Sequence, residues 1–380
     1  MAGIYIHIPF CKQACSYCDF YFITSLEYRE QFVTRLLKEI RSYRGSKFTD
    51  EPVETIYLGG GTPSVLSADQ LHQILEEVRD TFDVRVKEVT MEMNPDNVSA
   101  EYLNALLEIG VDRASMGVQS FDPDLLEFMH RAHDRDEALE CLRLLSETGF
   151  PTYSVDLIYG NPGQSTDCLK QDLDELLAFD PPHVSAYSLT IETDTRLGKQ
   201  YELGRLDPLP DEKVARHFEM VVDRLAEQGI QQYEVSNYSK PGQQAVHNAG
   251  YWSHKPYIGL GPSAHSFWWK KGKDAPVRWY TKQDIKTYLS GDRRQLIEET
   301  EQLTRRQLAD ERIMMGLRTR KGIAVDELSS RYGYDLNQRQ QSYLDQKKQE
   351  GIVKRLDPIQ LTFEGLKIAD ALILDLVSMQ

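Results

Sequence analysis

Short apolar runs rich in β-branched residues alternate with amphipathic helical segments from the N-terminus to about residue 270. The helical segments carry apolar residues three and four positions apart, as over 32–40 and 71–78, and a capping box of Ser67 and Gln70 precedes the second. Such alternation predicts a parallel sheet whose strands are joined by crossover helices. We expect strands over residues 4–8, 54–58, 88–92, 113–118, 154–158 and 183–189.

These strand–helix units are too few for a complete eightfold barrel. The pattern therefore predicts an α/β fold of the partial, TIM-like (β/α)6 barrel type. Ligands of such barrels bind at the carboxyl ends of the strands. The residues that follow each predicted strand are thus the first candidates for functional side chains.

The pattern changes at about residue 302, where helices with many Arg and Lys residues replace the strand–helix alternation. Two short β-type runs, 351–354 and 359–362, follow these helices and predict a small hairpin. We therefore expect a barrel unit over residues 1–270, a linker over 271–301, and a mainly helical, winged-helix-like domain over 302–380. We also expect this domain to cover the open end of the barrel.

Composition and charge restrict the classes of partner. With 44 Lys and Arg against 59 Asp and Glu, the formal net charge is −15, which disfavours binding to nucleic acid or to an anionic lipid surface. The basic runs at 305–306, 318–321 and 347–348 are interleaved with acidic residues, which indicates a solvated helical face. We expect no nucleic-acid partner.

The pattern predicts neither a membrane span nor export. No apolar run reaches the roughly 18 to 20 residues that a membrane-spanning helix needs. The N-terminus lacks the basic region and the cleavage site of a signal peptide. We therefore expect a cytoplasmic protein that reaches a membrane only transiently, through a protein partner.

Cys11, Cys15 and Cys18 form a C-x3-C-x2-C motif in the loop after the first predicted strand. Three thiolates at this spacing can bind three irons of a 4Fe-4S cluster and leave the fourth iron open. The amino and carboxylate groups of S-adenosylmethionine can chelate that open iron, and electron transfer into the sulfonium then breaks a carbon–sulfur bond. The alternatives are a redox thiol pair and a zinc site, for which His7 could supply the fourth ligand.

The remaining cysteines, Cys141 and Cys168, stand alone in amphipathic helical patterns. Free cysteine in such positions usually behaves as a small buried apolar residue. We expect both to pack in the core.

A glycine-rich run, G-G-G-T-P-S over residues 59–64, follows the second predicted strand. Glycines allow the backbone to approach a ligand closely and expose amide donors to a carboxylate or another polar group. Alone, such a run indicates only a tight strand-to-helix turn. Its position beside the cysteine loop, at the same end of the predicted sheet, favours a shared ligand site.

Taken together, these motifs resemble the radical S-adenosylmethionine superfamily, in particular its coproporphyrinogen dehydrogenase-like branch and, most closely, the haem chaperones of that branch. The resemblance covers nearly the whole chain and implies a radical SAM barrel. It rests on short motifs over residues 5–11, 15–18, 59–63, 92–95, 117–121, 130–133, 156–160 and 259–264.

The resemblance also implies a set of residues that contact S-adenosylmethionine. Their chemistry suits a zwitterionic sulfonium, because carboxylates accept from its ammonium and ribose hydroxyls while an arginine can pair with its carboxylate. A tyrosine can lie against the adenine. The set comprises Tyr5, Tyr17, Gly60, Gly61, Thr62, Glu92, Gln119, Arg131 and Asp156.

Two departures separate the sequence from the dehydrogenases of this branch. Those enzymes have a fourth cysteine two positions after the third, where this chain has Phe20. They also carry an N-terminal extension that helps to build the active site, whereas this chain begins almost at the first strand. Both departures argue against porphyrinogen decarboxylation and against an enzyme of that kind.

The segment His247-Asn248-Ala249-Gly250-Tyr251-Trp252 matches an H-N-x-x-Y-W motif associated with the haem chaperones. An imidazole can bind haem iron axially, and aromatic rings offer flat surfaces to a porphyrin. We therefore interpret His247 as a haem ligand, with His254 and His265 as weaker candidates. The alternative is a hydrogen-bonded loop histidine beside core aromatics.

The sequence thus predicts a haem chaperone that holds a 4Fe-4S cluster and S-adenosylmethionine. Haem would be its cargo, and haem-requiring proteins such as membrane respiratory cytochromes would be its acceptors. An electron donor would be needed if the cluster is reduced. The alternative function is an oxygen-independent coproporphyrinogen III dehydrogenase-type enzyme of porphyrin metabolism.

Overall fold

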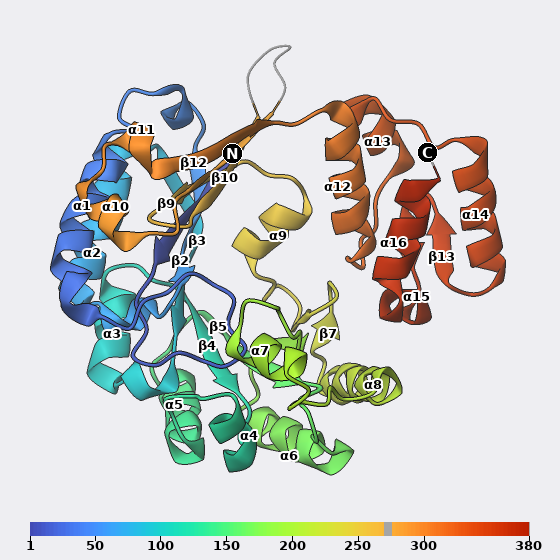
Figure 1. Cartoon of the computed structure of the whole chain (residues 1–380), viewed down its shortest axis with the longest axis horizontal. Helices are drawn as coiled ribbons and strands as arrows, with labels where there is room; N and C mark the ends of the chain where they lie inside the picture. Colours follow the sequence, from blue (N-terminus) through green and yellow to red (C-terminus); the bar gives the residue numbers. More distant parts are fainter. Residues whose placement is uncertain (270–275, 380) are drawn as a thin grey trace.

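A computed structural model describes residues 1–269 and 276–379. At its centre lies a run of parallel strands in which each strand pairs with the next along the chain. These strands confirm the predicted alternation and lie within a few residues of the expected positions (Figure 1). They are β1 (Ala2–Ile8), β2 (Val53–Gly60), β3 (Val84–Met93), β4 (Arg113–Gln119), β5 (Thr152–Tyr159) and β6 (His183–Ser188).

Crossover helices pack their apolar stripes against this sheet. The capping box of Ser67 and Gln70 opens the second of them, as predicted. Cys141 is buried in the core, whereas Cys168 is only half-buried and its Sγ donates to Oδ2 of Asp122 over 3.4 Å. The helices are α1 (Arg29–Arg41), α2 (Ala68–Thr81), α3 (Ala100–Glu108), α4 (Pro123–Phe128), α5 (Arg135–Glu147) and α6 (Thr166–Leu177).

The sheet extends beyond the six predicted strands on both sides. Beside β1 lie the parallel β9 and then three antiparallel strands, and beside β6 lie β8 and β7, also antiparallel. The added strands are β7 (Gln231–Gln232), β8 (Asn237–Ser239), β9 (Tyr257–Leu260), β10 (His265–Trp268), β11 (Val277–Thr281) and β12 (Ile297–Gln302).

The linker predicted over residues 271–301 therefore carries sheet and helix in its described part. It contains β11, α10 (Ile285–Ser290), α11 (Arg293–Leu296) and most of β12. Residues 271–275 lie outside the described residues. The boundaries between the predicted units stay predictions.

A second apolar cluster, separate from the barrel core, organises the C-terminal part. It is mainly helical and includes a two-stranded hairpin, as predicted. Its basic residues pair with acidic neighbours, for example Arg306 with Asp310 at 2.9 Å and Lys347 with Glu350 at 2.8 Å. Its elements are α12 (Arg305–Leu317), α13 (Val325–Tyr332), α14 (Gln338–Gln349), β13 (Val353–Leu356), β14 (Ile359–Leu361), α15 (Phe363–Lys367) and α16 (Ala369–Ser378).

Three further helices, α7 (Arg196–Glu202), α8 (Asp211–Glu227) and α9 (Val246–Trp252), connect β6 to β9. The C-terminal part packs against α9, and Figure 1 shows α9 between the sheet and α12. Among the described helices, none is both long enough and apolar enough to cross a membrane.

Candidate functional site

The cysteine loop follows β1 and places Cys11, Cys15 and Cys18 in half-buried positions. Burial raises the pKa of Cys11 to about 11 and the pKa of Cys18 to about 12, and the charge of Cys15 adds to both increases. The three sulfurs are therefore close enough to interact electrostatically. No group of three His, Cys, Asp or Glu side chains within residues 1–269 and 276–379 is placed to hold a metal ion. The thiolates of a cluster need not converge on one point, because each binds a different iron.

Hydrogen-bond donors face two of the three sulfurs. Oγ1 of Thr62 donates to Sγ of Cys11 over 3.5 Å, and Nη1 of Arg131 donates to Sγ of Cys15 over 3.2 Å. Asn94 links these two donors. Its Nδ2 donates to Oγ1 of Thr62 over 3.1 Å, and its Oδ1 accepts from Nη2 of Arg131 over 2.8 Å. The sequence did not predict Asn94 as a site residue. The contacts of Thr62 and Arg131 each place a hydrogen-bond donor against a sulfur, although burial still raises the pKa of Cys11 above its ordinary value.

His7, the fourth ligand that a zinc site would use, has both ring nitrogens engaged. Its Nε2 lies 2.8 Å from the carbonyl of Tyr21 and its Nδ1 lies 3.1 Å from the hydroxyl of Tyr5. Burial lowers the pKa of His7 to about 4, so the ring is neutral near pH 7. This geometry favours the cluster over the zinc alternative.

The glycine run forms a close contact between β2 and β1. Gly60 has φ of +105°, and a Cβ there would lie 2.5 Å from the ring of His7, so only glycine fits. Its amide donates to Glu92 over 3.0 Å, while the amides of Gly61 and Thr62 donate to backbone carbonyls over 2.9 and 2.7 Å. The Gly60 amide thus faces a carboxylate of the protein itself, and the amides of Gly61 and Thr62 are paired within the backbone rather than exposed to a ligand.

Arg131 is surrounded by residues from several strand ends. Besides Cys15 and Asn94, it donates to the hydroxyl of Tyr17 over 3.3 Å and to the carbonyl of Gly117 over 2.6 Å. Gln119, at the end of β4, has a left-handed φ of 73°. Arg131 therefore contacts the cysteine loop through Cys15 and Tyr17, while the contact of Tyr17, Gln119 and Arg131 with S-adenosylmethionine stays a prediction.

Glu92 lies at the carboxyl end of β3 and accepts from the Tyr57 hydroxyl over 2.7 Å. Burial raises the pKa of Glu92 to about 7, although the Tyr57 hydroxyl and the Gly60 amide oppose the increase. The ring of Tyr57 also packs against that of Tyr5, with centroids 6.0 Å apart. Tyr57 is thus a further site residue that sequence reasoning missed, because an inward-facing strand tyrosine carries no local signal.

The raised pKa of Glu92 predicts a pH dependence. A carboxyl whose pKa is higher in the folded than in the unfolded protein stabilises the fold when it is protonated. This stabilisation is complete at pH values below the pKa of the unfolded state, and it is lost as the pH rises through about 7, the pKa of the folded state. Between pH 5 and pH 7 we expect the unfolding free energy of the cluster-free wild type to fall by about 2 kcal/mol more than that of Glu92→Gln.

Urea unfolding of both proteins at the two pH values measures this difference. Glu108→Gln, which changes an exposed carboxyl on α3, is the control and should behave like the wild type. Equal pH dependence in wild type and Glu92→Gln would contradict the prediction.

Two buried polar atoms of the site lack protein partners. Oδ1 of Asp156 and Nε of Arg131 have no hydrogen-bond partner among the described residues. Burial raises the pKa of Asp156 to about 6, against hydrogen bonds from Ser185 and Ser115. A hydroxyl donor would satisfy the carboxylate and a carboxylate would satisfy the guanidinium. These residues fit S-adenosylmethionine, which carries both groups, and the cysteine loop fits a 4Fe-4S cluster.

His247 lies near the other end of the strands. Its ring is close to Gly3 and Thr55, near the amino ends of β1 and β2, whereas the cysteine loop follows the carboxyl end of β1. The buried carboxylate of Glu88 fixes this position, because it accepts from the amides of Val246 and His247, each over 2.8 Å.

Both ring nitrogens of His247 are occupied. Nδ1 lies 2.8 Å from Oγ1 of Thr55, and Nε2 lies 2.8 Å from the hydroxyl of Tyr251. Burial lowers the pKa of His247 to about 3. His247 is therefore a hydrogen-bonded histidine in this structure, which was the alternative to a haem ligand. Its role as a haem ligand stays a prediction.

The two weaker histidine candidates lie apart. His254 is buried, and its Nδ1 is 3.1 Å from the hydroxyl of Tyr332 in α13. His265 is exposed on β10 and its ring stacks on Tyr280. Neither shares the environment of His247.

The C-terminal part contacts the barrel near α9 rather than near the cysteine loop. Arg312 of α12 donates to the carbonyl of Trp252 over 3.3 Å, and the amide of Val235 donates to the carbonyl of Arg318 over 2.9 Å. Met314, Met315 and Arg318 also line a cavity with Tyr187 near the carboxyl end of β6, and the expectation that this part covers the open end of the barrel stays a prediction.

Two family models match the chain. The radical SAM superfamily matches residues 5–176, which include the cysteine loop, the glycine run and Arg131. The HemN C-terminal domain matches residues 303–366, which include α12, α13, α14 and the hairpin.

Curated relatives match most of the chain. The heme chaperone HemW of Bacillus subtilis (strain 168) is 33% identical over 375 residues, covering 96% of this chain and 96% of that protein. The heme chaperone HemW of Escherichia coli (strain K12) is 38% identical over 267 residues, covering 69% of each. A mitochondrial radical S-adenosyl methionine domain-containing protein 1 of Danio rerio is 33% identical over 333 residues, covering 85% of this chain and 74% of that protein.

A solved structure matches the whole fold. Coproporphyrinogen III oxidase (HemN) from Escherichia coli superposes with a TM-score of 0.82 and 20% sequence identity, covering 100% of this chain and 91% of that one. This likeness confirms the predicted radical SAM fold with its helical C-terminal region. Because the match to the Bacillus subtilis protein covers 96% of both chains at 33% identity, the chain belongs to the radical SAM superfamily and, within it, to the heme chaperone HemW family.

Proposed function

We propose that the protein is a haem chaperone that binds haem and passes it to haem-requiring proteins while holding a 4Fe-4S cluster and S-adenosylmethionine. The observation that carries this proposal is the match to curated heme chaperones over almost the entire chain, including the C-terminal part. The geometry of the cysteine loop supports the cofactor assignment.

The residues of the site have separable tasks in this proposal. Cys11, Cys15 and Cys18 would hold the cluster, which supplies electron transfer to bound S-adenosylmethionine. Thr62 and Arg131 donate hydrogen bonds to the sulfurs of Cys11 and Cys15 and would orient them toward the cluster. The unpartnered Oδ1 of Asp156 would accept from a ligand hydroxyl.

The acceptors are proposed to be membrane respiratory cytochromes. Because the formal net charge is −15, contact with an acceptor protein is favoured over electrostatic anchoring to anionic lipid. A reduced cluster would require a protein electron donor. Localisation in the cytoplasm, with transient contact at the membrane, is part of the same proposal.

The alternative function is a coproporphyrinogen-consuming radical enzyme. The residue that replaces the fourth cysteine, Phe20, is 64% exposed, so it supplies neither a thiolate nor a buried surface beside the loop. The structural likeness to coproporphyrinogen III oxidase, at 20% identity, concerns the fold alone. We therefore favour the chaperone.

One anaerobic experiment separates the two functions. The reconstituted full-length chain is titrated with haem, with and without S-adenosylmethionine, and then mixed with a haem-free cytochrome. The chaperone function requires stoichiometric haem binding and loss of haem to the cytochrome. Coproporphyrinogen consumption with substrate-dependent 5′-deoxyadenosine would instead establish the enzyme.

A further inference from the structure

A cavity of about 580 Å³ lies between α9, residues 234–237 and α12. Its volume is in the range of about 300 to 1,000 Å³ that is typical of pockets for small molecules and cofactors. Tyr251 and Trp252 line it, but the cavity does not include His247. A neighbouring cavity of about 260 Å³ shares Tyr251 and Met315 with it.

The cavity wall combines aromatic rings with two methionines. Trp252 and Tyr187 offer flat apolar surfaces, and Tyr187 is 41% exposed although it is a large ring. Met314 also packs against the C-terminal apolar cluster. Met315 is half-buried, lines both cavities and belongs to none of the apolar clusters of the described chain. Its thioether is thus free to meet a ligand, and thioethers are established axial ligands of haem iron.

One arginine stands at the edge of this wall. Nη2 of Arg318 pairs with Oδ1 of Asp370 at 2.6 Å, and the Asp370 side chain is 80% exposed. Exposed ion pairs contribute little free energy. A carboxylate of a bound ligand could therefore replace or join Asp370 at a small cost in free energy. Arginine can bind a carboxylate through two parallel hydrogen bonds, which strengthens such a contact.

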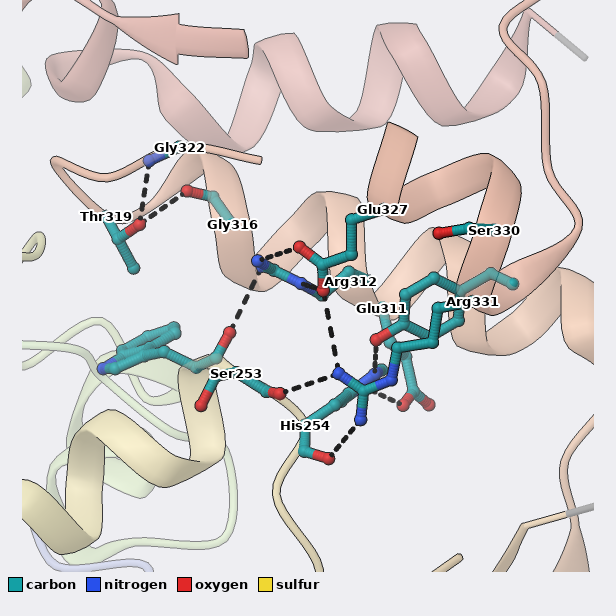
Figure 2. A network of polar contacts seen from close by, with 12 residues as sticks. Ser253, His254, Glu311, Arg312, Gly316, Thr319, Gly322, Glu327, Ser330 and Arg331 are labelled. Atoms are coloured by element: carbon teal, nitrogen blue, oxygen red, sulfur yellow. Dashed lines mark hydrogen bonds and ion pairs between the residues drawn. The ribbon is translucent and has the colours of Figure 1, made fainter. Parts of the chain in front are cut away.

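A polar network holds the two walls in place. Figure 2 shows Arg312 of α12 between Glu327 and the end of α9, where Arg312 donates to the carbonyl of Trp252. Arg312 bonds both carboxylate oxygens of Glu327, at 2.8 and 2.9 Å. Arg331 donates to the carbonyls of Ser253 and His254 over 3.3 and 3.1 Å. The end of α9 is thereby tied to the middle of α12 and to α13, so the cavity is pre-formed.

We propose that this α9–α12 cavity is the site of the haem cargo, a planar iron tetrapyrrole with carboxylate side chains. In this site the Met315 thioether binds the iron, Trp252 lies against the porphyrin, and Arg318 pairs with a propionate. His247 stays behind Tyr251 and does not reach the iron. The inference rests on the proposed haem-binding function and names the site at which it occurs.

The test uses the reconstituted full-length chain titrated with haem, followed by absorption and resonance Raman spectra of the reduced complex. Met315→Leu should weaken haem affinity about tenfold and remove the spectral signature of a thioether ligand. Met220→Leu, a half-buried methionine of α8 that packs on the barrel core, is the matched control and should change neither.

A second probe tests the carboxylate contact. Arg318→Leu should weaken haem binding about tenfold but leave the affinity for haem dimethyl ester, which has no free carboxylates, unchanged. His247→Ala should retain the thioether signature. These results would support the site.

Other outcomes overturn the inference. If Met315→Leu and Arg318→Leu bind haem like the wild type while His247→Ala loses an axial ligand, the iron binds at His247 and the proposed function survives. If the wild type binds no haem under any condition, both the site and the proposed function fail.

Discussion

Replacing Cys15 with serine will leave a folded chain that cannot hold a 4Fe-4S cluster. The loop would then supply only two thiolates, from Cys11 and Cys18, and a serine hydroxyl is a poor ligand for iron in such clusters. The substitution also removes the sulfur that accepts from Arg131 over 3.2 Å, so a buried guanidinium loses one partner. We expect near-complete loss of bound iron and sulfide, measured chemically and by visible absorption after anaerobic reconstitution.

Cys168→Ser provides the matched control. Cys168 is also a half-buried free cysteine, but it lies on α6 and donates to Asp122 rather than facing the loop. This variant should retain wild-type iron and sulfide. A Cys15→Ser protein with an intact cluster, or a Cys168→Ser protein without one, would contradict the assignment of the ligands.

Replacing Glu88 with alanine will destabilise α9 and weaken haem binding. The Glu88 carboxylate is 4% exposed and accepts from the amides of Val246 and His247, so its removal leaves two buried donors unpaired. Unpaired buried donors cost about 1 to 3 kcal/mol each, and we expect the unfolding free energy to fall by about 3 kcal/mol. Urea unfolding measures this change, and a haem titration at low urea shows whether affinity falls with it.

Two variants control for this prediction. Glu88→Gln keeps one acceptor oxygen and should give an intermediate loss of stability. Glu108→Ala removes an exposed carboxylate on α3 and should change neither stability nor haem affinity. If Glu88→Ala were as stable as the wild type, the carboxylate would not be what holds α9 in place.

The barrel strands and the cysteine loop could be predicted because their signals are local. Alternating apolar runs define each strand, and the three cysteines lie within eight consecutive positions. The added strands β7 to β12 were not predicted, because short, mostly antiparallel strands such as Gln231–Gln232 carry almost no periodicity. Pairing with an existing sheet edge, rather than their own sequence, makes them strands.

The site residues also divide into those with a local sequence signal and those without one. Thr62 and Arg131 could be selected from motifs, and the structure places both beside the cysteine sulfurs. Asn94 and Tyr57 were missed as site residues. Their importance depends on which hydroxyl, guanidinium or carboxylate lies opposite them, and a single sequence does not record this.

By itself the sequence determined the parallel α/β barrel, the cysteine loop after its first strand and the mainly helical C-terminal part, because short-range periodicity and spacing encode each of these. Only the tertiary structure decided where the H-N-x-x-Y-W segment lies and which groups its histidine contacts. The hydrogen bond of His247 to Thr55 joins residues 192 positions apart, and that of its amide to Glu88 joins residues 159 apart. Such partners are selected by the packing of the whole chain, since buried polar groups must find a hydrogen bond wherever the fold supplies one.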